Sequence, residues 1–130
     1  MELAFAGEFA RFEHIRVHPK PRRGRIPVVV GGNSDGALAR AASWGDGWYG
    51  FNLPDLDAVR ERVAVLHSRT RAAGRDPAAL EIAVALADTA EADVAALADA
   101  GVTQLVLVAS PPEDPGEARE WTRGLAARGL

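Results

Sequence analysis

The feature that most constrains this chain is residues 26–51, in which two apolar runs flank a double glycine and an alanine-rich segment. The first run, 28–30, is all valine and is typical of a buried strand. Gly31 and Gly32 interrupt it, and residues 37–42 have the spacing of a helix that packs close to a sheet. Residues 47–51 predict a second strand. Strand, glycine turn, helix and strand together form one βαβ unit.

The pattern continues with alternating helices and strands to the end of the chain. It predicts a helix over 56–73, a strand over 80–86, a helix over 92–100, a strand over 104–108 and a last helix from Pro115. Asp88 and Glu91 resemble a capping box for the helix expected over 92–100. The inner face of the last helix is expected at Ala118, Trp121 and Leu125.

This order, strand then helix four times, defines an α/β fold with parallel strands and right-handed connections. Four βα units are half of a (β/α)8 TIM barrel. They also suit an open, doubly wound sheet of four strands. Hydrophobic periodicity alone leaves both architectures open.

Residues 1–25 are expected to be an irregular leading segment and connector, and residues 26–130 the domain of four βα units. Residues 14–18 alternate weakly, as in an exposed strand, and 19–24 form a basic segment bounded by prolines. His14 and His18 would share a strand face, but no third ligand lies nearby in the sequence. We therefore predict a solvated edge and no metal site.

Composition excludes several classes of function. The chain has 130 residues, enough for one domain with a real core, and a net charge of −3 that gives no electrostatic basis for binding nucleic acid. No apolar run approaches the ~20 residues of a membrane span. There is no cysteine, and the first ten residues lack the basic start of a signal peptide, so we expect a cytoplasmic protein.

The glycine turn is the most specific candidate for a ligand-binding site in the sequence. Gly31 and Gly32 let a ligand approach the backbone closely, and Asn33 and Ser34 follow at the start of a helix, where N–H groups favour an anion such as phosphate. An ordinary tight turn with a capped helix explains the same residues. The residues by themselves favour neither interpretation.

Several segments, in order, resemble the luciferase-like monooxygenase family. They are Gly7-Glu8-Phe9, Pro19-Lys20-Pro21, Ile26-Pro27-Val28-Val29-Val30-Gly31-Gly32-Asn33-Ser34, Gly45-Asp46-Gly47-Trp48-Tyr49, Ala73-Gly74-Arg75-Asp76-Pro77 and Ala100-Gly101-Val102-Thr103. The resemblance implies a (β/α)8 barrel, of which this chain is similar to the C-terminal half, strands five to eight. Within the family the pattern is nearest to oxidoreductases that use the deazaflavin coenzyme F420, with FMN-dependent monooxygenases second.

The resemblance also implies roles for particular residues. The turn of Gly31, Gly32, Asn33 and Ser34 would hold the coenzyme phosphate, which favours the phosphate interpretation over the plain turn. Trp48 and Tyr49 would line a pocket for a small-molecule substrate, although an indole usually lies in the core, and we expect Trp48 in the core or behind the pocket and Tyr49 to be the more exposed of the two. A second phosphate contact is expected near Ala109 and Ser110.

Two further residues near the turn have plainer interpretations. Asp46 is expected to accept N–H groups of its own turn, and Arg40, nearly two helical turns beyond Ser34, to lie on the surface. No catalytic residue is identified, because the family's acid–base candidates lie mostly in the absent half.

Half a barrel leaves strand edges and an inner face uncovered, so we expect a homodimer or a partner half-barrel. The alternative to an oxidoreductase is a truncated, non-catalytic module that binds the coenzyme or serves a structural role.

Overall fold

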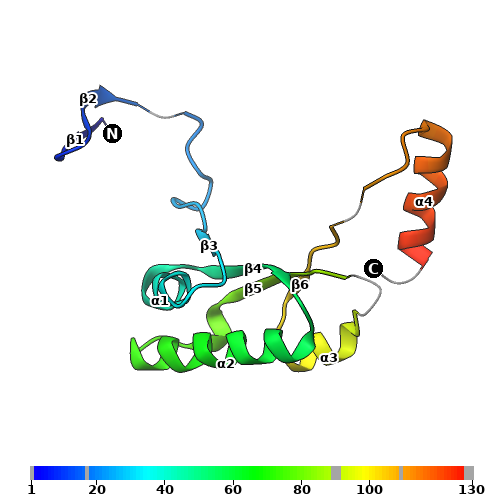
Figure 1. The fold of residues 1–130 in the computed structure, drawn as a ribbon. Coiled ribbons are helices and arrows are strands. Elements are labelled where there is room, and N and C mark those ends of the chain that lie inside the picture. Colours follow the sequence, from blue (N-terminus) through cyan, green and yellow to red (C-terminus); the bar gives the residue numbers. More distant parts are fainter. Residues whose placement is uncertain (1, 17, 89–91, 109, 128–130) are drawn as a thin grey trace.

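The computed structural model describes residues 2–16, 18–88, 92–108 and 110–127. Its centre is a parallel sheet of four strands in the order β3 (Val29–Gly31), β4 (Gly47–Leu53), β5 (Glu81–Leu86) and β6 (Gln104–Leu105) (Figure 1). The α/β class and the parallel strands are confirmed, and the sheet has the strand order of consecutive units in a TIM barrel.

Helices alternate with these strands. They are α1 (Asp35–Trp44), α2 (Leu56–Ala72), the short 3-10 helix η1 (Pro77–Ala79), α3 (Val94–Asp99) and α4 (Pro115–Ala127). Helices α1, α2 and α3 pack against one face of the sheet, and α2 contacts both of the others (Figure 1). Within the described residues, no helix is long and apolar enough to cross a bilayer.

The core lies between the sheet and these helices. Alternate strand residues Val30, Trp48, Ile82 and Val84 are buried there against Leu38, Val59, Val63 and Leu66 of the helices. The alternation follows from the strand period of two, which sends every second side chain to the same face.

The opposite face of the sheet is uncovered in the described part of the chain. Val29 is 43% exposed and Phe51 is 51% exposed, and both lie on this face. An apolar, open sheet face is what the sequence predicts for half of a barrel, because the inward face of a complete barrel is filled by its other strands.

Side chains at the helix ends fix the path of the chain around the sheet. Ser34 caps α1, and Asp55 caps α2 by accepting from the N–H of Ala58 at 2.8 Å. The predicted cap of α3 is wrong: Asp93 caps this helix by accepting from the N–H of Ala96 at 3.0 Å. Glu91 of the proposed capping box lies outside the described residues.

The C-terminal part departs from the expected packing. Strand β6 covers only Gln104–Leu105 of the predicted 104–108 and pairs with β5 alone, although the N–H of Val106 still donates to the carbonyl of Val84 at 2.8 Å. The three positions predicted to face inward, Ala118, Trp121 and Leu125, are half-buried, whereas the rest of α4 is exposed and none of its residues is fully buried. After Pro111 and Pro112 the chain leads α4 away from the sheet, where no described element packs against it (Figure 1).

The leading segment contains more regular structure than the pattern predicts. Strands β1 (Leu3–Ala6) and β2 (Arg11–Ile15) form an antiparallel hairpin, with the rings of Phe5 and Phe12 stacked at 5.9 Å. The hairpin stands apart from the parallel sheet, and every one of its strand residues is exposed (Figure 1). Among the described residues, no group of three acidic, histidine or cysteine side chains has the arrangement of a metal site.

Candidate functional site

The glycine turn joins the end of β3 to the start of α1. Gly32 has a positive φ of 113°, a conformation that glycine adopts without steric strain. Its N–H donates to the carbonyl of Tyr49 at 3.1 Å, which extends the pairing of β3 with β4 by one residue. This turn therefore leaves the sheet at a defined point and places the first turn of α1 beside it.

The side chains of Asn33 and Ser34 hold the turn in place. The amide nitrogen of Asn33 donates to the carbonyl of Phe51 at 2.7 Å, and its amide oxygen accepts from the N–H of Phe51 at 3.2 Å. The hydroxyl oxygen of Ser34 accepts from the N–H of Ala37 at 3.2 Å. The side chain of Asn33 therefore holds the turn against β4, and the side chain of Ser34 holds it against α1.

Trp48 supports the turn from the core side. Its side chain is fully buried, and the indole N–H donates to the carbonyl of Gly32 at 2.7 Å. Of the two positions that the sequence left open for Trp48, the structure has the core position. The indole fixes the carbonyl side of the turn and leaves the N–H side free.

Four consecutive backbone N–H groups of this turn remain available to a ligand. Among the described residues, none accepts from the N–H of Asn33, Ser34, Asp35 or Gly36. Free N–H groups at the start of a helix attract anions. The carboxylate of Asp35, which would repel an anion there, is paired with Arg62 and Arg69 of α2 at 3.3 Å each.

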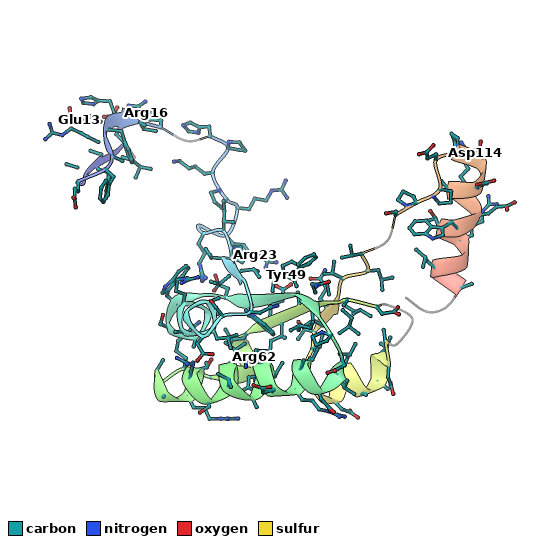
Figure 2. The ribbon with its side chains drawn as sticks, in the orientation of Figure 1. Glu13, Arg16, Arg23, Tyr49, Arg62 and Asp114 are labelled. Carbon is teal, nitrogen blue, oxygen red and sulfur yellow. The ribbon has the colours of Figure 1, made fainter. Side chains whose placement is uncertain are left out.

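A hollow lies beside the turn on the open face of the sheet. It has a volume of about 410 Å³, and its lining includes Gly31, Tyr49, Glu81, Ala83 and Gln104. These residues align across the strands, since Gly31 pairs with Tyr49, Tyr49 with Ala83 and Ala83 with Gln104. Figure 2 shows Tyr49 on the side of the sheet away from Arg62. Glu81 and Gln104 were not predicted from the sequence. Both are polar residues at the start of an apolar strand, and this pattern could have indicated them.

Arg40 is exposed, as expected for a surface residue, but its guanidinium turns back along α1. Its Nη1 is 3.6 Å from where a Cβ on Gly36 would lie, so it sits over the first turn of the helix. Among the described residues, no carboxylate forms an ion pair with Arg40. Ala109 lies outside the described residues, and Ser110 is exposed after β6.

Asp46 lies immediately before the start of β4. Its carboxylate accepts from the N–H of Val28 at 2.8 Å and pairs with Arg25, and its carbonyl accepts from the N–H of Glu81 at 3.0 Å. The guanidinium of Arg25 and the N–H of Val28 hold the pKa of Asp46 below its usual value. Asp46 thus ties together the starts of three strands. It accepts N–H groups, as predicted, but from Val28 and Glu81 rather than from its own turn.

This lowered pKa predicts a specific pH dependence of stability. A carboxylate whose pKa is lower in the folded protein adds stability above pH 3.8, its unperturbed value, and loses it as the pH falls through the folded pKa. We expect the difference in unfolding free energy between the wild type and Asp46→Asn to be constant from pH 7 to 5 and to shrink below pH 3.8. Urea unfolding of both proteins at each pH measures it. A difference that grows on acidification would contradict the assignment.

The residue that sequence reasoning missed most clearly is Arg75. Its guanidinium donates to the carbonyls of Ala41 at 3.1 Å, Ala42 at 2.8 Å and Gly45 at 2.6 Å. It therefore caps the C-terminal end of α1 from the turn after α2, and charge-assisted bonds of this kind are the strong ones. No local signal in the sequence links positions 30 residues apart.

Comparison with known proteins identifies the family. The luciferase-like monooxygenase family model matches residues 1–129, so the chain belongs to that family. An uncharacterized protein of Mycobacterium tuberculosis (strain H37Rv) is 40% identical over 106 residues, which are 79% of this chain and 35% of that protein. The pyrimidine monooxygenase RutA of Allorhizobium ampelinum is 30% identical over 89 residues, 65% of this chain and 23% of the enzyme.

Solved structures share the fold. An F420-dependent secondary alcohol dehydrogenase, in complex with an F420-acetone adduct, aligns with a TM-score of 0.53 and 19% identity over 65% of this chain and 25% of that one. A riboflavin lyase with modified FMN and riboflavin aligns with a TM-score of 0.52 and 15% identity, over 65% and 19% of the two chains. The chain spans about a third of the length of the mycobacterial relative and less of the others.

Proposed function

We propose that residues 26–130 are the C-terminal half-barrel of a flavin- or deazaflavin-dependent oxidoreductase and supply its coenzyme phosphate site. The observation that carries the proposal is the run of four free N–H groups, from Asn33 to Gly36, next to the hollow on the open face. Family membership and the two structural neighbours, one with an F420-acetone adduct and the other with modified FMN, support a phosphorylated coenzyme. Coenzyme F420 is our first choice and FMN the second.

The residues fit such a group in three respects. Gly31 and Gly32 add no side chain to block a phosphate, and the free N–H groups supply donors at the positive end of α1. The carboxylate of Asp35 pairs with two arginines of α2, and these ion pairs offset its negative charge near the turn. Tyr49 lies on the open face, where it would border the ring or a small-molecule substrate.

The coenzyme supplies the redox chemistry when bound, and the protein binds and orients it. Within this proposal the turn anchors the phosphate end, Trp48 and Asn33 keep the turn rigid, and the sheet face excludes water from one side of the site. We assign no proton donor to this chain.

Turnover by this proposal needs the other half of a barrel. The open sheet face and the unpaired edges of β3 and β6 call for a covering chain, either a second copy in a homodimer or a separate N-terminal half-barrel. Both relatives are more than twice as long as this chain, which is consistent with a missing half. We propose a cytoplasmic setting for the assembly.

The second candidate is a non-catalytic module that keeps the fold and has lost turnover. The uncovered face favours it, because a barrel active site is assembled from loops on all sides of the barrel. A module that serves only a structural role differs from the oxidoreductase half in that the isolated chain has no affinity for a coenzyme.

Titration of the full chain with FMN, coenzyme F420 and riboflavin, followed by fluorescence, tests the proposal. Riboflavin shares the FMN ring but lacks the phosphate. Charge-assisted hydrogen bonds contribute about 1.5–3 kcal/mol each, so FMN is expected to bind at least about tenfold more tightly than riboflavin. Equal affinities, or no binding by a folded chain, would overturn the phosphate site and favour the non-catalytic module.

A further inference from the structure

A second hollow, of about 470 Å³, lies at the opposite edge of the sheet from the glycine turn. Its walls come from the last two turns of α2, from the turn that leads into η1, and from the starts of β5 and β6. Because the strands are parallel, the start of β5 and the end of β3 lie at opposite edges. All lining residues lie between positions 67 and 103 of the chain.

Two nitrogen-bearing side chains face this hollow from one side of α2. His67 and Arg71 are four residues apart, so they lie one above the other on the same face of the helix. Arg62 and Arg69 of the same helix pair with Asp35, whereas Arg71 takes part in no ion pair within the described residues. Burial, and then the nearby guanidinium of Arg71, lower the pKa of His67 below its ordinary value and favour the neutral imidazole.

The remainder of the lining is mainly apolar. Leu80 and Ile82 are buried at the start of β5 and border the hollow. Gly101, at a positive φ of 94°, contributes no side chain, and a Cβ there would lie 3.4 Å from Cε1 of His67. Ligand pockets typically enclose about 300–1,000 Å³ and combine apolar walls with few polar groups, and this hollow does the same.

We propose that this hollow binds a small organic anion that has an apolar, ring-sized body and a single carboxylate. The guanidinium of Arg71 and a ring N–H of His67 donate to the carboxylate, and the body lies against Leu80 and Ile82. The carboxylate of Asp76 borders the same hollow, where it caps η1 by accepting from the N–H of Ala78 at 2.9 Å. Its negative charge repels an anion with two charges more strongly than a monocarboxylate, which separates this site from a phosphate site. The proposal does not depend on coenzyme binding.

Titration of the 15N-labelled full chain with 2-naphthoate, followed by amide chemical shifts, tests this inference. We expect saturable shifts confined to residues 66–82 and 100–104. The neutral 2-naphthylmethanol and the cationic 2-naphthylmethylamine have the same ring and are expected to bind at least about tenfold more weakly, since a hydrogen bond to a charged group contributes about 1.5–3 kcal/mol.

Matched variants on α2 assign the effect to Arg71. Arg71→Gln is expected to weaken 2-naphthoate binding at least about tenfold and to leave 2-naphthylmethanol unchanged. Arg60→Gln removes the same charge from the same helix, at an exposed position paired with Asp57, and is expected to leave both affinities unchanged. Circular dichroism and the urea midpoint check that both variants fold. Absence of saturable shifts, equal binding of the three naphthyl compounds, or equal effects of the two variants would overturn the proposal.

Discussion

Replacing Gly31 with valine is expected to abolish FMN binding while the chain folds as before. A Cβ built on Gly31 meets no heavy atom within 4 Å, and its φ is not in the left-handed region. The added side chain would project into the hollow beside Tyr49, next to the free N–H groups that we assign to the phosphate. Fluorescence titration with FMN is expected to show a loss of at least about a hundredfold, roughly 2.7 kcal/mol or more of binding free energy.

Gly32→Val is the matched comparison, because the neighbouring glycine has a different structural role. Its φ of 113° strains any residue with a side chain, and a Cβ there would lie 3.3 Å from the Cβ of Ala37. We expect this variant to lose both stability and FMN binding, with strain of the order of 1–3 kcal/mol. Unfolding of Gly31→Val, or wild-type FMN affinity in that variant, would mean that the glycines serve the turn alone.

The double glycine, the helix spacing and the apolar runs predict the central βαβ unit because they are local signals that the tertiary structure reinforces. β3 follows the valine run with a shift of one residue, and β4 and α2 lie where the pattern places them. Ser34 and Asp55 cap their helices through bonds to N–H groups three residues further on, which are contacts between residues close in the sequence.

Interactions between distant parts of the chain were less accessible from the sequence. The contact of Arg75 with the end of α1 and the bond from Trp48 to Gly32 join segments that only the folded sheet brings together. The apolar face of α4 satisfies the helical period, yet the period does not specify what the face packs against. The sequence likewise does not specify what the hairpin of β1 and β2 packs against, and its apolar residues remain exposed in this structure.

Truncating Trp48 to alanine is expected to destabilise the chain by about 3–5 kcal/mol, the range for removing a buried aromatic side chain. The indole is fully buried, and it occupies space left by Gly50, where a Cβ would lie 2.6 Å from the ring. For a domain of this size such a loss is a large part of the total stability. Urea unfolding measures it.

Trp48→Phe separates the packing of the indole from its hydrogen bond. Phenylalanine keeps most of the apolar contact but leaves the carbonyl of Gly32 without its donor, at a cost of about 1–3 kcal/mol. Because that carbonyl belongs to the proposed phosphate turn, we also expect weaker FMN binding under conditions where the variant is fully folded. Trp44→Phe is the control: Trp44 is 56% exposed, and its replacement is expected to change neither stability nor FMN binding. If Trp48→Phe lowered stability and left FMN affinity unchanged, the indole would support the core without ordering the turn.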